Sequence, residues 1–480
     1  MTPRRKLLVL LICCSSLLMV SMDNTIVNVA LPSIRRDLHA SLSGLQWTID
    51  AYTLVLASLL MLSGSTGDRL GRRRTFQVGL ATFTLGSLLC SVAPGLGWLV
   101  AARALQAVGG SMLNPVAMSI ITNVFTDARE RARAIGIWGA VVGISMALGP
   151  VVGGALTETV GWRANFWINI PIGIAAFVLA AVFVPESRAA HPRRPDPVGQ
   201  LLVAAALLAL TYGIIEGPRR GWTAPAILGL FAAAALAVVG LLLWEPRREQ
   251  PLLDLRFFRS VPFSSATVTA VCGLGAFAGF LFLNTLYLQD VRGYSAFMAG
   301  VCTLPMAVAS FALAPLSGRI VGSRGARIPL YTAGACIAVS TLLLTRLSPT
   351  TPLALLLAAY LVFGIGFGML NAPITNTAVS GMPRTQAGVA AAVASTSRQV
   401  GASLGVAISG SIAGAATGLI GPGFAAATRP AWWLMVGCGV LIMVLAGVAT
   451  TRSARASAAA AAALFTDDLT TPEREPAPAR

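Results

Sequence analysis

The sequence predicts an all-α protein that crosses a membrane many times. Of its 480 residues, 56% are hydrophobic and only 11% are charged, whereas a soluble domain carries about 25% charged residues. Apolar stretches of about 20 residues recur along the whole chain, and each can cross a hydrocarbon core about 30 Å thick. Backbone polar groups find no water in that core, so the spans must be helices.

Fourteen spans are predicted, and many are separated by short turns rich in proline and glycine. The first 22 residues imitate a signal peptide, but no small-residue cleavage site follows and the apolar stretch continues to Ala30. We therefore interpret them as the start of a retained first span. The predicted spans are 7–31, 44–66, 75–94, 97–123, 134–157, 164–184, 197–216, 225–244, 261–288, 296–317, 328–347, 353–376, 386–412 and 430–450.

A charged loop rich in glycine occurs twice and indicates an internal repeat. The first copy, Gly64–Arg74, reads Gly-Ser-Thr-Gly-Asp-Arg-Leu-Gly-Arg-Arg-Arg. At an offset of 254 residues, Gly318–Arg327 keeps two of its glycines but loses its acid. The repeat predicts two six-helix halves. The predicted division is 7–184 for the N-terminal half, 197–244 for an inserted helix pair, 261–450 for the C-terminal half and 453–480 for a disordered cytoplasmic tail.

The distribution of charge orients the chain and removes the need for a nucleic-acid partner. The formal net charge is +17, and the predicted spans place most basic residues on one side, together with both termini. By the positive-inside rule, both termini are predicted to be cytoplasmic. The single lysine, Lys6, lies outside any Gly-x-x-x-x-Gly-Lys-[Ser/Thr] pattern, so the sequence lacks the phosphate-binding loop of many ATPases. Uphill transport would then use an ion gradient or a separate energising subunit.

No metal site, cofactor or disulfide is predicted. The seven cysteines fall inside apolar spans without metal-ligand spacing, and His39 and His191 fall in loops. We interpret the cysteines as packing residues. One lysine among many alanines and arginines is typical of a GC-rich bacterial genome, which favours a bacterial plasma membrane.

The loop Gly64–Arg74 resembles the cytoplasmic loop signature between the second and third helices of major facilitator superfamily transporters. Further stretches resemble signatures of the fourteen-helix drug:proton antiporters within it, the QacA/EmrB-like group. They are 22–32 (Met-Asp-Asn-Thr-Ile-Val-Asn-Val-Ala-Leu-Pro), 103–110, the glycines of the fifth span, and Trp162-Arg163 with 166–171. Ala107 stands where that group usually has glycine. The resemblance covers about residues 5–450 and implies two parallel six-helix halves with a substrate site near the membrane midplane.

In the fifth span, the resemblance and the residue types both point to gating. Glycines four residues apart let a neighbouring helix approach closely, and a proline permits a bend. Tight packing alone is the alternative. The candidate gating residues are Gly143, Gly149, Pro150, Gly153 and Gly154.

Asp23, Asp50 and Arg103 are intramembrane charges of the N-terminal half, where ionised groups are rare and usually functional. The span directions place Asp23 about 24 Å from the inner end of its helix and the other two about 9 Å below their outer ends, so all three fall in one layer. Burial favours a neutral acid, and a nearby guanidinium favours the carboxylate. We predict that Asp23 carries a proton and Arg103 tunes it. Alternatively, Arg103 is a tether between helices and Asp50 pairs statically or faces the interface.

The charged loop is not expected to titrate. By resemblance, Asp68 pairs with arginine and caps a helix across the two halves, which would stabilise one conformation; a solvated loop that only sets topology is the alternative. The residues of this predicted conformational latch are Gly64, Asp68, Arg69, Gly71, Arg72 and Arg73.

Amides and aromatic residues within the spans predict a substrate cavity. An apolar pocket with aromatics and a few amides suits lipophilic drugs, including cations, although the aromatics would equally fit a lipid-facing surface. An arginine in mid-helix, Arg398, must face an interior. The candidate cavity residues are Asn24, Asn28, Gln106, Phe280, Asn284, Tyr287, Asn371 and Arg398.

The sequence therefore predicts a monomeric plasma-membrane antiporter that exports a lipophilic drug or antibiotic in exchange for protons. One alternative is an exporter of a lipid, siderophore or other metabolite on the same scaffold. A second is a membrane receptor or scaffold without transport activity. An enzyme is least favoured, because the sequence offers no cluster of nucleophile, metal ligands or base.

Overall fold

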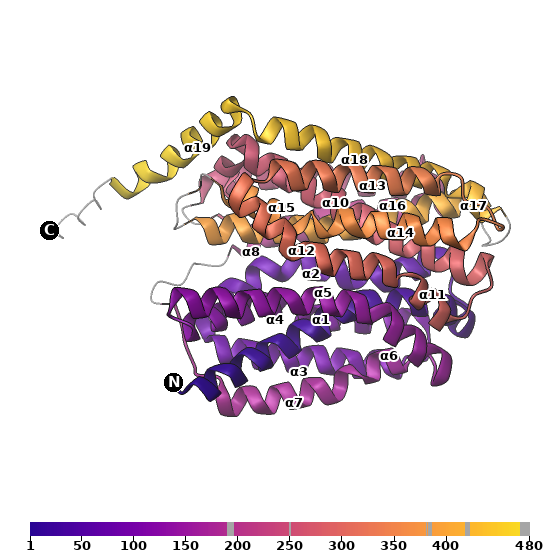
Figure 1. Cartoon of the computed structure of the whole chain (residues 1–480), viewed down its shortest axis with the longest axis horizontal. Helices are drawn as coiled ribbons and strands as arrows, with labels where there is room; N and C mark the ends of the chain where they lie inside the picture. The colour runs from indigo at the N-terminus through magenta and orange to yellow at the C-terminus, as the bar shows by residue number, and fades with distance from the viewer. Residues whose placement is uncertain (190–195, 249–250, 381, 383–385, 418–422, 471–480) are drawn as a thin grey trace.

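The computed structural model describes residues 1–189, 196–248, 251–380, 382, 386–417 and 423–470, and every regular element within them is a helix. Most of the helices lie roughly along one common direction (Figure 1). We call the end of the molecule at which the first helix begins the proximal end, and the end at which that helix finishes the distal end.

The first seven helices pack on one another and form the first bundle. The main contacts join α1 to α5, α2 to α4 and α3 to α4. Glycines bring α3 and α4 together, because a Cβ at Gly109 would lie 2.3 Å from the backbone nitrogen of Phe83. The helices are α1 Pro3–Leu38, α2 Leu42–Leu70, α3 Arg72–Ser91, α4 Leu96–Val124, α5 Ala128–Thr159, α6 Ala164–Trp167 and α7 Asn169–Phe183.

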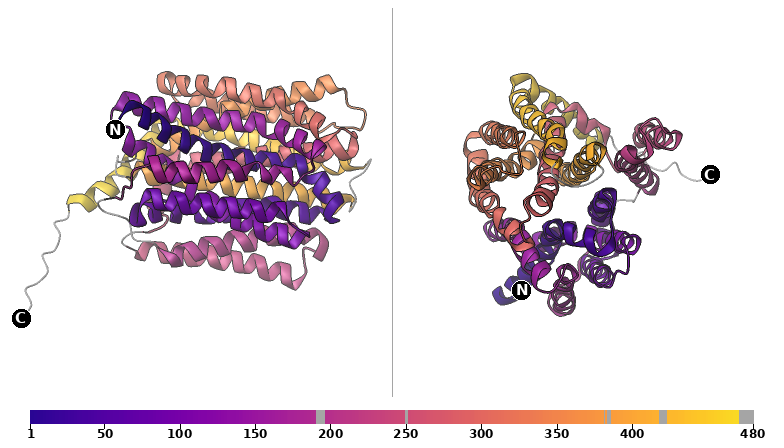
Figure 2. Two further views of the ribbon diagram at one scale, coloured as in Figure 1. Left: turned by 90° about the horizontal axis from the view of Figure 1, so that it is seen from below. Right: turned by 90° about the vertical axis from the view of Figure 1, so that its right-hand side faces the viewer.

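Helices α10 to α18 form the second bundle, in which α10 packs on α16, α13 on α18 and α12 on α14. The view along the helices shows the two bundles side by side (Figure 2, right). The elements are α10 Val261–Leu286, a π-helical turn Tyr287–Val291, α11 Ala296–Cys302, α12 Leu304–Arg324, α13 Arg327–Leu344, α14 Leu353–Gly368, α15 Asn371–Val379, α16 Ala387–Thr417, α17 Phe424–Ala427 and α18 Arg429–Ala449.

The pair α8 Pro197–Arg220 and α9 Pro225–Trp244 stands beside the junction of the two bundles. Helix α8 contacts both α2 and α16. The Gln200 amide donates a hydrogen bond to the Ser58 carbonyl of α2, and the Ser411 hydroxyl of α16 donates one to the Ile214 carbonyl at 2.5 Å. Short 3-10 turns at Glu245–Arg247 and Leu255–Arg259 follow the pair.

Four hydrophobic segments are each divided into two helices, and a proline follows each division closely. The divisions fall at Ile168, Thr303, Met369–Leu370 and Thr428, and the prolines are Pro171, Pro305, Pro373 and Pro430. The first three divisions lie inside predicted spans, and Thr428 lies just before the span predicted at 430–450. A proline has no N–H to donate, and its ring clashes with the carbonyl four residues earlier, which favours an interruption at these places.

Twelve helices among the described residues have the length and hydropathy of a membrane span. The prediction of fourteen spans is thus supported for twelve. The two others, predicted at 75–94 and 386–412, correspond to α3 and α16, which are helical but carry more polar side chains, including Arg72–Arg74 and Arg398.

The tail differs from its prediction. Instead of being disordered from residue 453, the chain forms α19 Arg452–Thr470 at the proximal end (Figure 1). Its residues Ala454, Ala458, Ala461 and Phe465 are buried, at the spacing of one helix face. The Phe465 ring lies 5.0 Å from the Phe257 ring. The alanine-rich stretch thus provides a helix with one packing face.

The two bundles are joined at the distal end. The Gln46 amide donates to the Ala407 carbonyl at 2.8 Å, the Gln289 amide donates to the Val29 carbonyl at 2.8 Å, and Arg35 and Asp290 form an ion pair at 3.6 Å. At the proximal end, no hydrogen bond or ion pair links the bundles within the described ranges. This structure is therefore a distal-closed conformation.

Candidate functional site

A buried polar cluster lies inside the first bundle and is built from α1, α3, α4 and α7. Its members are Asp23, Ser87, Arg103, Gln106 and Asn169, each at most 1% exposed. We call this set the Asp23 cluster. Helices α3 and α4 can contribute adjacent side chains because Gly86 lies against Gln106, where a Cβ would come within 2.5 Å of the Gln106 Cα atom.

The Asp23 carboxylate is fully coordinated. Its Oδ2 accepts a hydrogen bond from Arg103 Nη1 at 2.5 Å, and its Oδ1 accepts from Gln106 Nε2 at 2.9 Å and from Asn169 Nδ2 at 3.2 Å. The Ser87 hydroxyl in turn lies 3.1 Å from Asn169 Nδ2. An ionised carboxylate suits three donors, one of them cationic.

The Arg103 guanidinium is held on every side. It also donates to the Gln106 Oε1 at 2.8 Å and to the Thr48 carbonyl at 3.2 Å. It lies over the Tyr52 ring, 4.3 Å from the centroid. Protonation of Asp23 in this geometry would leave a buried cation without its counter-charge, at a cost of about 3–5 kcal/mol. The ion pair therefore links α1 to α4 in this conformation.

Asp50 is buried but does not join the Asp23 cluster. It lies on α2, where the Thr53 hydroxyl contacts its Oδ1 at 3.3 Å and Ser403 of α16 is its neighbour across the seam between the bundles. Within the described part of the chain, its Oδ2 accepts no hydrogen bond of ordinary geometry and it forms no ion pair. Asp50 is therefore a buried acid with hydroxyl neighbours and no cationic neighbour among the described residues.

The charged loop is held within the first bundle. Arg72 Nη2 lies 2.8 Å from Asp68 Oδ1, and Glu186, beyond the end of α7, accepts a hydrogen bond from the Arg73 backbone at 3.1 Å. Gly71 has φ +115°, which ends α2 and starts α3. None of these contacts reaches the second bundle, so the predicted pairing across the two halves is not formed in the distal-closed state.

The gating candidates of α5 lie between two helices at the distal end. Gly149 and Gly153 face α1, where added Cβ atoms would meet Thr25 and Ile26. Gly154 faces α11, where an added Cβ would meet the carbonyl oxygen of Ala296. Gly143 approaches Phe311 of α12, and Pro150 lies inside an unbroken α5. These small residues therefore let α5 contact both bundles at once.

Three of the predicted cavity residues lie in the core of the second bundle instead. Phe280, Asn284 and Tyr287 are at most 1% exposed. The Phe280 ring stacks on Phe363 at 4.1 Å, and Asn284 Oδ1 accepts a hydrogen bond from the Tyr360 hydroxyl at 2.7 Å. They form neither a cavity lining nor a lipid-facing surface in this conformation. Sequence pattern cannot separate these cases, because an aromatic side chain fits all three.

The remaining predicted cavity residues keep polar atoms available. On α1, Asn24 and Asn28 donate to carbonyls one turn earlier, and the buried Asn28 Oδ1 has no partner among the described residues. Among the described residues, Arg398 of α16 contacts only the hydroxyls of Ser395 and Thr375, at 3.2 and 2.5 Å. Asn371 is half-buried at the start of α15.

The described residues contain no group of three or more His, Cys, Asp or Glu side chains that could hold a metal ion, and all seven cysteines are free. His191 and residues 471–480 lie outside the described ranges. Sequence reasoning did not assign Ser87, Asn169 or Glu186 to any site. Asn169 belongs to the stretch 166–171, which carries part of the family resemblance. An amide near the start of an apolar span is the sequence signal that could have pointed to it.

Two helical bundles that meet along one seam, with a buried acid–guanidinium pair inside one of them, define a multi-pass membrane transporter. The chain belongs to the major facilitator superfamily, whose family model matches residues 13–406. This membership makes it a transporter rather than an enzyme.

Relatives of known name support the same conclusion. The chain is 37% identical over 409 residues to the multidrug resistance protein Stp of Mycobacterium tuberculosis. The aligned residues cover 85% of this chain and 76% of that protein. It is 37% identical over 406 residues to the tetracenomycin C resistance and export protein of Streptomyces glaucescens, covering 84% and 75%. It is 36% identical over 415 residues to the multidrug efflux pump LfrA of Mycolicibacterium smegmatis, covering 86% and 81%.

Solved structures share the fold at much lower identity. A bacterial homologue of the human lysosomal transporter Spinster, in an inward-facing and occupied conformation, superposes with a TM-score of 0.65 at 17% identity over 98% of this chain and 99% of that one. The human organic anion transporter MFSD10 gives a TM-score of 0.63 at 14% identity, over 93% and 100%. At these identities the likeness concerns the fold alone.

Proposed function

We propose that this protein exports lipophilic drugs or antibiotics across a bacterial plasma membrane in exchange for protons. The observation that carries the proposal is the Asp23 cluster, in which a buried carboxylate and a buried guanidinium share one hydrogen-bond network. Intramembrane acids of this kind typically serve proton relays in transporters. The named relatives, which include multidrug efflux pumps and an antibiotic export protein, supply the substrate class.

The coupling mechanism follows from the contrast between the two acids. In the distal-closed state Asp23 forms an ion pair with Arg103, whereas Asp50 lies in the α2–α16 seam and has no cationic partner among the described residues. Opening of the seam would hydrate Asp50 and allow it to ionise, and closing it again would require a proton. A proton taken up on the distal side thus permits closure, and Asp23 has already released its own proton when Arg103 pairs with it.

The substrate contacts of the second bundle favour neutral or acidic drugs over cations. Arg398 forms no ion pair with a carboxylate within the described ranges and contacts only hydroxyl groups. Such a guanidinium attracts carbonyl or acidic oxygens and repels cations. Asn24 and Asn28 of α1, with Asn371 of α15, would add amide contacts. Export of a lipid, siderophore or other metabolite on the same scaffold remains the alternative function.

The proposed transporter has fourteen membrane-spanning helices and both termini in the cytoplasm. Helices α3 and α16 are the two spans added to the twelve helices whose length and hydropathy already suit a span. Helices α3 and α16 are favoured as spans because each packs along a helix of its own bundle, α4 and α10 respectively. We propose 7–184, 197–244 and 261–450 as the three units of a functional monomer. Asp68 and its arginines would engage the second bundle only when the proximal end closes.

Proteoliposomes with an imposed pH gradient test the proposal. Purified protein should accumulate a neutral or acidic lipophilic drug against its gradient, and substrate should release protons from the protein in unbuffered detergent solution. Accumulation that ignores the pH gradient would remove the proton from the mechanism. If no compound of a drug panel is transported but a lipid, siderophore or other metabolite is, the alternative function is correct.

A further inference from the structure

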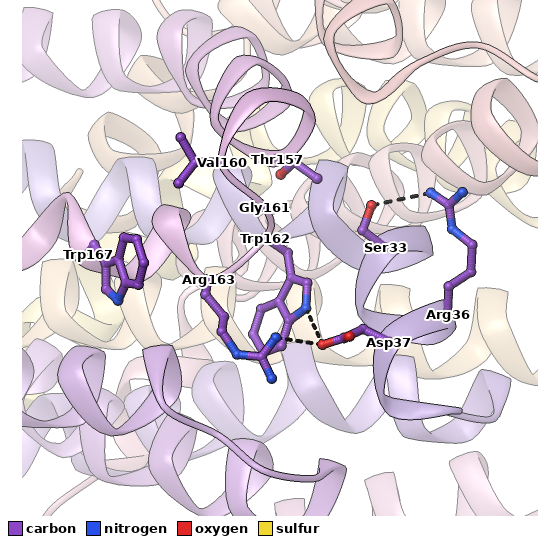
Figure 3. Close-up of a pocket in the computed structure, with 9 residues that line it drawn as sticks. All are labelled: Ser33, Arg36, Asp37, Thr157, Val160, Gly161, Trp162, Arg163 and Trp167. Atoms are coloured by element: carbon purple, nitrogen blue, oxygen red, sulfur yellow. Dashed lines mark hydrogen bonds and ion pairs between the residues drawn. The ribbon is translucent and has the colours of Figure 1, made fainter.

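An open pocket of about 540 Å³ lies at the distal edge of the first bundle, away from the Asp23 cluster. The end of α1, the end of α5 and the turn into α6 form it (Figure 3). The side chains that decide its chemistry are Arg36, Asp37, Val160, Trp162, Arg163 and Trp167.

The pocket carries a net positive charge. Asp37 Oδ2 accepts from Arg163 Nη1 at 2.6 Å and from Trp162 Nε1 at 3.0 Å, so its charge is already matched. Arg36 donates to the Pro32 carbonyl and the Ser33 hydroxyl, both at 3.3 Å, and forms no ion pair with a described carboxylate, although it also interacts electrostatically with Asp290, the partner of Arg35. Figure 3 shows the Arg36 side chain on the opposite side of Asp37 from Arg163. One guanidinium is thus free to bind an anion.

The pocket lies at the depth of lipid headgroups. Four tryptophans about half exposed occur near the distal ends of α4, α6, α8 and α18, and they are Trp98, Trp167, Trp222 and Trp433. Exposed tryptophans gather at the interface between hydrocarbon and headgroups. Trp167 is both a member of this belt and a wall of the pocket.

An apolar path leads from the pocket along the edge of the molecule. Val160 is 60% exposed beside it, and Ile174, Val178 and Val182 are exposed on α7 below Trp167. Their spacing places them on one helix face, and α7 lies at the outer edge of the first bundle (Figure 1). Acyl chains can therefore lie on α7 while a headgroup occupies the pocket.

We propose that this pocket binds the phosphate group of an anionic phospholipid of the distal leaflet. Arg36 supplies the charge-assisted hydrogen bonds to the phosphate oxygens. Trp167 and the exposed face of α7 accommodate the glycerol and acyl portions. The open, lipid-side position favours a lipid over free phosphate, because a free anion would gain only the contact with Arg36.

The test compares the full-length protein with Arg36→Gln and with a matched control, Arg346→Gln. Arg346 is an exposed arginine at the same distal end, after α13, and it forms no ion pair in the described part of the chain. Phosphatidylglycerol, phosphatidylcholine and inorganic phosphate are each titrated into detergent-solubilised protein, and bound molecules are counted by native mass spectrometry.

Arg36→Gln should bind phosphatidylglycerol about fivefold more weakly, since one arginine near a membrane surface contributes on this scale. Arg346→Gln should bind it like the wild type, and phosphatidylcholine should bind weakly to all three proteins. Equal phosphatidylglycerol binding by Arg36→Gln and wild type would overturn the site. Equal binding of phosphatidylcholine would overturn the charge argument. Displacement of phosphatidylglycerol by low millimolar phosphate would assign the pocket to a free anion instead.

Discussion

Asp23 and Asp50 are both fully buried acids of the first bundle, but only Asp23 has a cationic partner. Asp23 faces Arg103, Gln106 and Asn169, and Asp50 faces hydroxyl groups in a seam that must open during transport. A neutralising substitution should therefore destabilise the protein at Asp23 and leave its stability nearly unchanged at Asp50.

Asp23→Asn should abolish drug accumulation driven by a pH gradient and also destabilise the protein. The substitution leaves the buried Arg103 without its counter-charge, which costs about 3–5 kcal/mol. Thermal unfolding in detergent and transport in proteoliposomes measure the two effects. The double variant Asp23→Asn/Arg103→Gln should recover part of the stability but no transport. Unimpaired proton-driven transport by Asp23→Asn would remove it as the proton carrier.

Asp50→Asn should keep the wild-type stability within about 1 kcal/mol, because Asp50 has only hydroxyl neighbours among the described residues and a hydrogen bond of this kind contributes about 1 kcal/mol. It should lower gradient-driven accumulation at least tenfold, because closure no longer requires a proton. Drug counterflow, which needs no net proton movement, should stay within about threefold of wild type and serves as the control. Gradient-driven accumulation at the wild-type rate would show that Asp50 only pairs statically.

Residue types identified the centre of the Asp23 cluster but not its surroundings. Asp23, Arg103 and Gln106 are conspicuous because charged and amide groups are rare inside spans. Ser87 and Asn169 look ordinary in the sequence, and only the packing of α3 and α7 against α1 brings them together. Phe280 was assigned to a cavity and lies in a core, because an apolar helix does not record which of its faces a neighbour covers.

Among the elements, α5 touches both bundles through its glycines. Gly154→Ala should disfavour the distal-closed state, because the added methyl group would meet the backbone of Ala296 and Phe297 at 2.4 and 2.8 Å. Overpacking of this kind costs about 1–3 kcal/mol. Hydrogen exchange in residues 287–297 should rise, and transport should fall.

The matched control for this variant lies on the same helix. Gly139 has nothing within 4 Å of an added Cβ, so Gly139→Ala should leave both exchange and transport close to wild type. If both substitutions change exchange and transport equally, the effect comes from the lost flexibility of a glycine in α5 and not from the contact of Gly154 with α11.

The positions of helices were largely predictable, and their interruptions had a readable cause. Hydropathy placed every predicted span on a helix or helix pair, with ends that overrun it by at most three residues, and a proline follows each of the four divisions closely. We did not use those prolines to place the breaks. The helical tail α19 was missed, because its packing face consists of alanines and one phenylalanine that meet Phe257 only in the folded molecule.

For the whole molecule, the repeated charged loop indicates two related halves. In the structure, the matched glycines of the two copies occupy the same place at the end of a helix. Gly71 ends α2 with φ +115° and Gly325 ends α12 with φ +82°, a region that favours glycine. The sequence gives no indication of which end is closed. The distal contacts of Gln46, Gln289 and Arg35 follow no motif, because they exist in only one of the conformations that the chain must visit.

The ion pair between Arg35 and Asp290 is a distal contact that can be removed with little damage to the fold. Its removal should shift the equilibrium between the distal-closed and distal-open states. The side chains of Arg35 and Asp290 are 27% and 20% exposed. Ion pairs of this kind contribute about 0–1 kcal/mol. Asp290→Asn should therefore raise the distal-open population by at most about fivefold. Faster hydrogen exchange in residues 29–38 should report this shift, and high salt should reduce the difference from wild type because it screens the pair. Glu130→Gln breaks a comparable pair with Lys6 inside the first bundle and should leave that exchange unchanged. If both variants exchange alike, closure of the distal end depends on the buried amide and glycine contacts, and the surface charge plays no part in it.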